Sequence, residues 1–168
     1  NLLASVAIQG LYFYSYSFLN RSLHTSTEYT GIIYAITAFF FMIGSYLSGF
    51  LVQRIGARTS TIFGILTFSI VTVLYHFTPT LSLTIALIFI GNFFEGIRYS
   101  SLNILSLRQV PDFSGSMMSL TNAAANLGYS IGAGIGGLLL LFYGWRAMGI
   151  FYGCIGTLAI FVILILVK

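Results

Sequence analysis

The chain has 168 residues, of which 58% are hydrophobic, 17% aromatic and only 6% charged. Soluble domains carry about 25% charged residues, and the seven basic and three acidic side chains here cannot cover a water-soluble surface. This composition excludes a soluble globular domain, a disordered region and a nucleic-acid-binding protein. It predicts an all-α integral membrane protein whose surroundings are a lipid bilayer.

Long uncharged stretches divide the chain into candidate membrane spans. A helix needs about 20 apolar residues to cross the hydrocarbon core, and the charged residues, together with Pro79, separate six such stretches. We therefore expect one transmembrane domain over residues 1–168. Its helices are expected over residues 3–22, 29–53, 58–76, 80–107, 114–142 and 146–167.

The first two expected helices each carry a polar face. Gln9, Tyr12 and Tyr16 share one side of helix 3–22, and Tyr34 lies on a similar side of helix 29–53. Because polar groups facing lipid are costly, these side chains are expected to line a substrate cavity. The alternative is that they only hydrogen bond between packed helices.

The connection after helix 29–53 is rich in glycine and arginine. Gly49, Arg54, Gly56 and Arg58 lie there, and Asp112 precedes helix 114–142. One interpretation is a gate on the inner side, in which Asp112 pairs with the two arginines. The other is that these arginines follow the positive-inside rule.

The same rule gives an orientation. With the N-terminus of this segment in the cytoplasm, four basic residues lie inside and two outside, which favours that orientation in a cell (plasma or inner) membrane. The inner residues are Arg54, Arg58, Arg108 and Lys168, and the outer ones are Arg21 and Arg146.

Helix 80–107 holds the only acidic residue inside an expected span, Glu95. Asn92 and Tyr99 share its face, with Arg98 at the margin, so Asn92, Glu95 and Tyr99 are expected in the cavity. Two interpretations stay open. Glu95 and Arg98 form a structural ion pair, or both are coupling residues and Glu95 exchanges a proton or contacts a cationic substrate group.

Helix 114–142 has two contrasting sides. Asn122 and Asn126 occupy one and are expected in the cavity; Gly128, Gly132 and Gly136 occupy the other. A glycine side allows close approach of another helix, which serves either gating or static packing. The gating interpretation places it at an interface with a second half.

Helices 58–76 and 146–167 lack comparable polar faces, so they are expected to shield the other four from lipid. Each triplet of helices then contributes its first two members to the cavity, which is the arrangement of a 3+3 inverted repeat. His24 and His76 fall in or beside expected outer loops and should be solvated. No metal site, cofactor or enzyme active site is expected, and the sequence lacks the His-Glu-x-x-His motif of zinc proteases.

Three motifs resemble those of the major facilitator superfamily. Residues 49–58 (GFLVQRIGAR) resemble its cytoplasmic signature Gly-x-Leu-Ala-Asp-Arg-x-Gly-Arg-Arg, with Gln53 and Ala57 as departures. Residues 91–98 (GNFFEGIR) are similar to Arg-x-x-Gln-Gly, with Asn92 in place of Arg. Residues 128–137 (GYSIGAGIGG) resemble the antiporter motif Gly-x-x-x-Gly-Pro-x-x-Gly-Gly, with Ala133 in place of Pro.

This resemblance implies the C-terminal six-helix half of a twelve-helix secondary transporter, similar to the drug and sugar efflux (drug:proton antiporter) branch. Its missing N-terminal half would complete the substrate site. Such a permease would move a small amphipathic or sugar-like solute by alternating access, coupled to protons. The alternative is a six-helix channel or receptor that acts as a homo-oligomer.

Overall fold

The computed structural model describes residues 1–166, except for the side chains of residues 9–11. All regular structure in this range is helical, which confirms the expected all-α class. In chain order the elements are α1 (Leu2–Tyr12), α2 (Tyr14–Ser22), α3 (Thr27–Ile55), α4 (Ala57–Phe77), α5 (Leu81–Gln109), the short 3-10 helix η1 (Pro111–Phe113) and α6 (Ser114–Leu166).

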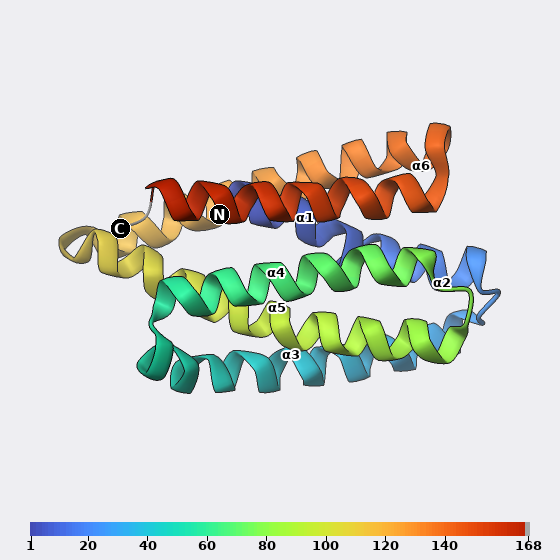
Figure 1. The fold of residues 1–168 in the computed structure, drawn as a ribbon, viewed down its shortest axis with the longest axis horizontal. Coiled ribbons are helices and arrows are strands. Elements are labelled where there is room, and N and C mark those ends of the chain that lie inside the picture. The colour runs from blue at the N-terminus through green and yellow to red at the C-terminus, as the bar shows by residue number, and fades with distance from the viewer. Residues whose placement is uncertain (167–168) are drawn as a thin grey trace.

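Three of the expected spans differ from the observed elements in how they are divided. The expected helix 3–22 corresponds to α1 and α2, which are separated only at Phe13, where φ is −84° and ψ is −39°. The expected helices 114–142 and 146–167 correspond to two arms of α6. The arms meet at Gly144, where φ is 77° and ψ is −174°. Because glycine alone adopts such a φ readily, the chain reverses there and the second arm returns along the first (Figure 1).

The helix ends follow local signals. α3 begins at Thr27 because the Ser26 side chain accepts a hydrogen bond from the backbone N–H of Tyr29 at 3.3 Å. It ends at Gly56, whose φ is 84°. α4 ends before Pro79, and Thr78 is extended, as the residue before a proline prefers.

Four of these helices, α3, α4, α5 and α6, are long and apolar enough to cross a membrane. The 53 residues of α6 would extend about 80 Å as a straight helix, against about 30 Å for a bilayer core. Its reversal at Gly144 therefore gives two passes. Together with the exposed apolar side chains along these helices, this length and composition identify an integral membrane protein.

The helices pack in neighbouring pairs rather than in chain order. α1 lies along α6, α3 lies along α5, and α4 lies between α5 and α6 (Figure 1). The largest buried cluster includes Phe18 on α2, Phe68 and Tyr75 on α4, and Ile88 on α5. The 3+3 inverted repeat stays a prediction about how these helices are related.

His76 corrects one expectation. Its side chain is only 3% exposed, whereas the sequence placed it beside a solvated loop. α4 continues through Phe77, and the returning arm of α6 covers its end, so the imidazole packs against Phe18 and Trp145. Its Nδ1 lies 2.7 Å from the carbonyl oxygen of Thr72, one turn earlier.

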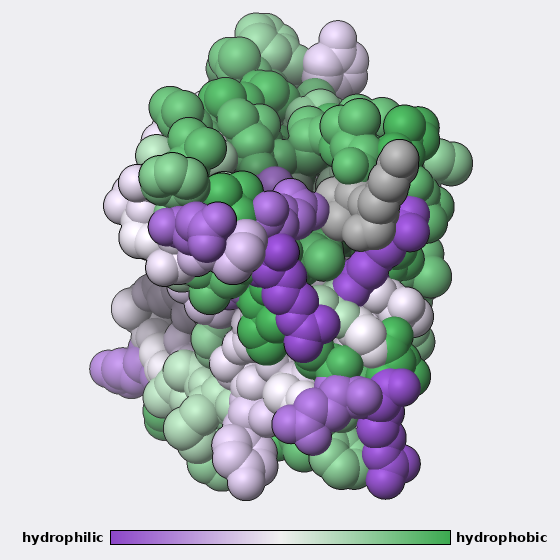
Figure 2. Space-filling view, turned by 90° about the vertical axis from the view of Figure 1, so that its left-hand side faces the viewer, coloured by the Kyte–Doolittle hydropathy of each residue, from purple (hydrophilic) through white to green (hydrophobic). Residues whose placement is uncertain are grey.

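The two ends of the bundle differ in their charged residues. Arg54 in the last turn of α3, Arg58 at the start of α4, Arg108 in the last turn of α5 and Asp112 in η1 belong to the same end. Figure 2 shows this end, where hydrophilic side chains gather among hydrophobic ones. These four charged residues therefore lie at the helix ends and in η1, outside the apolar middle of the helices.

Candidate substrate cavity

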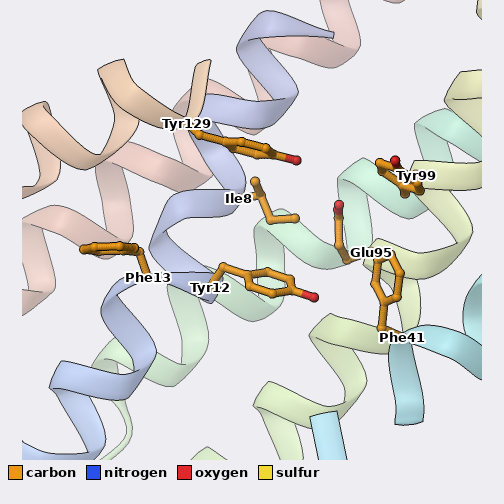
Figure 3. Close-up of a pocket in the computed structure, with 7 residues that line it drawn as sticks. All are labelled: Ile8, Tyr12, Phe13, Phe41, Glu95, Tyr99 and Tyr129. Carbon is orange, nitrogen blue, oxygen red and sulfur yellow. The ribbon is translucent and has the colours of Figure 1, made fainter. Parts of the chain in front are cut away.

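A cavity of about 400 Å³ opens between four helical segments. This volume falls within the range of small-molecule sites, about 300–1,000 Å³. The lining side chains that the structure describes are Ile8, Tyr12, Phe13, Phe41, Glu95, Tyr99 and Tyr129 (Figure 3). They come from α1 and its junction with α2, α3, α5 and the first arm of α6, which correspond to the helices that the sequence assigned to a cavity.

The cavity wall is amphipathic. Aromatic rings form most of it, and Figure 3 shows the hydroxyl ends of Tyr12 and Tyr129 pointing towards the side that carries Glu95 and Tyr99. A tyrosine offers an apolar ring and a hydrogen-bonding hydroxyl in one side chain. Such a wall suits a solute with an apolar body and a few polar groups.

Close packing of α3 on α5 places two of these rings. A side chain at Gly96 would put its Cβ 2.2 Å from the carbonyl oxygen of Phe41, so only glycine permits this approach. As a result the rings of Phe41 and Tyr99 lie 5.9 Å apart, centre to centre, at the cavity wall.

Glu95 contributes a carboxylate to this wall, and Arg98 on the same helix donates hydrogen bonds to it. The Nε of Arg98 donates to one carboxylate oxygen of Glu95 at 2.5 Å, and Nη2 donates to the other. Both side chains are almost fully buried, each 1% exposed. Two parallel N–H···O bonds are the strongest geometry of such a pair, so the predicted Glu95–Arg98 ion pair is present.

Arg98 is itself confined by α4. A Cβ at Gly64 would lie 2.8 Å from the Cβ of Arg98, which shows how closely α4 and α5 pack at this level. The third guanidinium nitrogen, Nη1, is buried and has no hydrogen-bond partner. One donor group of Arg98 is therefore unused in this arrangement.

A family profile described as Major Facilitator Superfamily matches residues 1–168. The chain belongs to the Major Facilitator Superfamily. It is therefore a membrane transporter of small molecules, and members of this family are generally not enzymes. Comparison with curated proteins gives no match.

Three of the residues predicted for the cavity of this Major Facilitator Superfamily protein lie together in its wall, namely Tyr12, Glu95 and Tyr99. The side chain of Gln9, also predicted there, lies outside the described residues. Tyr34 instead supports the wall from outside, because its hydroxyl donates to the carbonyl oxygen of Tyr12 at 2.7 Å. Tyr16 packs edge-on against Tyr34, with ring centres 5.6 Å apart.

The three predicted asparagines are not among the lining residues. Asn92 is 3% exposed, and its side-chain nitrogen donates to the carbonyl oxygen of Ile88 at 2.8 Å. Its polarity is therefore satisfied within α5. Asn122 and Asn126 are exposed on the first arm of α6, and their part in a cavity stays a prediction.

The arginines and aspartate of the predicted gate are not brought together. Nη2 of Arg58 donates to the carbonyl oxygen of Leu164 at 2.7 Å, and the guanidinium of Arg54 lies 4.3 Å from the ring centre of Phe50. Within residues 1–166 the only ion pair is that of Glu95 and Arg98, so Asp112 has none. Gly49 has open space around its α-carbon, and Gly56 ends α3.

The predicted gating glycines face inwards within this bundle. A Cβ at Gly128 would meet the carbonyl oxygen of Leu2 on α1 at 2.5 Å, and a Cβ at Gly136 would meet Tyr152 and Tyr14. Gly132 is also buried. The close helix approach expected from these glycines is therefore present, and its partners are α1, α2 and the second arm of α6.

Sequence reasoning missed two aromatic lining residues for which a signal existed. Phe41 continues the spacing of Thr30, Tyr34 and Thr37 along the polar face of α3, but it is apolar. Tyr129 follows Asn122 and Asn126 at helical spacing. A polar face does not include Phe41, whereas Tyr129 lies on the same side as Asn122 and Asn126 and could have been included with them. Ile8 and Phe13 carry no such signal.

Proposed function

We propose that this transporter is the C-terminal six-helix half of a secondary permease that moves a small amphipathic or sugar-like solute by alternating access. The missing N-terminal half completes the cavity, and export across the cell membrane is the direction that the motif resemblance implies. The observation that supports the proposal most is the Glu95–Arg98 pair beside the aromatic cavity. Burying charged side chains in a membrane helix is costly, and such residues usually mark a transport pathway.

Glu95 is the proposed coupling residue. A carboxylate at the cavity wall can take up a proton when the cavity opens to one side and release it on the other. Arg98 positions that carboxylate through its two hydrogen bonds. The solute binds against Tyr12, Tyr99 and Tyr129, so solute and proton occupy adjoining parts of one site.

The test is solute-dependent proton flux in liposomes that contain the full-length protein and an enclosed pH-sensitive dye. The solutes are phenylacetate, methyl glucoside and 2-phenylethylammonium. We expect at least one of them to change the internal pH with the wild type, and Glu95→Gln to abolish that change, because the amide cannot carry the proton. Glu28→Gln is the matched control, because Glu28 is exposed in the first turn of α3.

Proton flux that persists in Glu95→Gln would overturn the role of Glu95. Conduction of ions that neither saturates with solute nor requires it would favour a channel instead.

A further inference from the structure

Glu95 and Arg98 form an ion pair with no net charge in the interior of the bundle. Within residues 1–166, the other charged side chains lie near helix ends or beside the break at Gly144. Both carboxylate oxygens of Glu95 are occupied by Arg98. The pair has no net charge, so it can remain buried at 1% exposure.

The pair limits which ligand can bind it. The guanidinium of Arg98 cannot lose its proton, and an uncompensated buried charge is very costly. A cation that took Glu95 from Arg98 would leave the site with a net positive charge. An anion that took Arg98 from Glu95 would leave it with a net negative charge, unless a proton neutralised Glu95 at the same time.

We propose that the cavity binds an amphipathic monoanion with an oxyanion headgroup together with one proton, the anion replacing the Glu95 carboxylate on Arg98. In this exchange the two N–H···O bonds from Arg98 to Glu95 break and two form to the substrate oxyanion. One proton from the aqueous phase is added to a carboxylate oxygen of Glu95. The net charge of Arg98, Glu95 and ligand stays zero.

This inference rests on the proposed function, because it uses the same cavity and the same coupling residue. The described residues fit the ligand class in two ways. Aromatic rings supply surface for an apolar body, and the Nη1 of Arg98 has a free donor for a further oxygen.

The order of events follows from where the two residues lie. Glu95 lines the cavity (Figure 3). Arg98 is bonded to the Glu95 carboxylate but is not among the lining residues that the structure describes, so an anion in the cavity meets Glu95 first. An anion therefore reaches Arg98 only after Glu95 has turned away, and Glu95 turns away at low cost only when it is protonated. Proton uptake and anion binding are thus obligatorily linked.

Among the described side chains that line the cavity or flank the pair, no second acid competes for this proton. These groups are Arg98 and Tyr99 on α5, Tyr12 on α1, Tyr129 on α6, Phe41 on α3 and Gly64 on α4. Tyrosine ordinarily titrates near pH 10, and arginine remains charged. Glu95 is therefore the group of this set that can take up the proton.

The charge balance also gives the direction of coupling. The empty site and the site loaded with both anion and proton are neutral, whereas either ligand alone leaves a net charge buried. Only the two neutral states change conformation easily, so anion and proton cross together. This is co-transport, and it differs from the antiport that the motif resemblance implies. Export is then driven by an outward gradient of the anion.

The test is equilibrium binding to the full-length protein in lipid nanodiscs, measured by titration calorimetry. Phenylacetate, phenylacetamide and 2-phenylethylammonium serve as probes, because they share one aromatic body and differ in headgroup charge. Repeating the titration in buffers with different ionisation enthalpies counts the protons bound. We expect phenylacetate to bind with uptake of one proton, and its affinity to fall by up to about tenfold for each pH unit wherever Glu95 is ionised in the empty protein.

Glu95→Gln is the decisive variant, because the amide imitates the protonated carboxyl. It should bind phenylacetate without proton uptake and with no dependence on pH, whereas Glu28→Gln should behave as the wild type. The double variant Glu95→Gln/Arg98→Gln carries no charge at the pair, and it should lose phenylacetate binding.

Several results would overturn the proposal. They are the absence of phenylacetate binding, phenylacetate binding to the wild type without a proton, and tighter binding of 2-phenylethylammonium that Glu95→Gln removes. In the last case, if proton flux still depends on Glu95, the proposed function stands and only the anion assignment fails. If Glu95→Gln keeps solute-dependent proton flux, the proposed function fails as well.

Discussion

Tyr152 on the second arm of α6 donates a hydrogen bond from its hydroxyl to the carbonyl oxygen of Gly132 on the first arm, at 2.8 Å. Tyr152 is fully buried. A second tyrosine, Tyr14 on α2, donates to the next carbonyl, that of Ala133, at 2.5 Å. Two tyrosines from different segments therefore hold consecutive carbonyls of the glycine-rich arm and fix its position inside the bundle.

The hydroxyl of Tyr152 should contribute measurably to stability. Tyr152→Phe removes one buried hydrogen bond and keeps the ring, so we expect a loss of about 1 kcal/mol in the free energy of unfolding. Unfolding in detergent micelles on addition of denaturant measures this. Tyr143→Phe is the control, because Tyr143 is 73% exposed at the end of the first arm of α6. Equal losses in both variants would show that the bond to Gly132 contributes nothing.

The packing of α1 on α6 predicts opposite effects on stability for two glycine-to-alanine variants. Gly128→Ala would place a methyl group 2.5 Å from the carbonyl oxygen of Leu2 and 2.8 Å from the Cβ of Ser5. A backbone oxygen cannot move aside alone, so we expect a loss of about 1–3 kcal/mol. Gly134→Ala meets nothing within 4 Å and should gain up to about 1 kcal/mol through its helix propensity.

The same micelle assay measures both variants. If Gly128→Ala is as stable as Gly134→Ala, then α1 does not pack on α6 as closely as the structure shows.

Helix positions could be predicted from the sequence because a membrane span requires a long apolar stretch, and few residues interrupt these stretches. Apolar stretches of suitable length, interrupted by arginines, Pro79 and Gly144, leave little choice of where the chain can turn. Tyr12, Glu95 and Tyr99 could also be predicted for the cavity, because they lie on polar faces of their helices. The break between α1 and α2 at Phe13 could not, since Phe13 keeps helical φ and ψ and no residue there marks an interruption.

The rest of the site could not be predicted because a helical face does not reveal what it touches. Asn92 shares the face of Glu95, yet it satisfies itself on Ile88 within its own helix. Phe41 and Tyr129 reach the cavity only because of how α3 and α6 pack on their neighbours. His76 was misplaced for the same reason, since the second arm of α6 covers it. Residue spacing gives the direction of a side chain around its own helix, whereas the packing between helices determines what that side chain contacts.

Packing, and not charge, should account for the contribution of His76. Its Nε2 is buried without a hydrogen-bond partner, so His76→Phe removes a polar atom at little cost and should lie within about 1 kcal/mol of the wild type. His76→Ala opens a cavity beside Phe18 and should cost about 2–5 kcal/mol. His24→Asn is the surface control, because His24 is exposed and asparagine accepts its φ of 51°.

Thermal unfolding in micelles separates these variants. A loss in His76→Phe as large as that in His76→Ala would mean that the imidazole nitrogens, and not the ring volume, stabilise this end of α4.

The Glu95–Arg98 pair predicts strong coupling between two substitutions. Glu95→Gln leaves the Arg98 guanidinium buried without a counter-charge, and Arg98→Gln does the same to the carboxylate. Each single variant should lose about 3–5 kcal/mol of unfolding free energy, since removing one partner leaves a buried charge uncompensated. The double variant Glu95→Gln/Arg98→Gln keeps two polar amides and no charge, so its stability should lie within about 1 kcal/mol of the wild type. Unfolding of all four proteins in one detergent gives the coupling energy as the departure from additivity. Additive losses would mean that the two side chains do not depend on each other for their burial, and the inference that an anion must replace Glu95 on Arg98 would lose its physical basis.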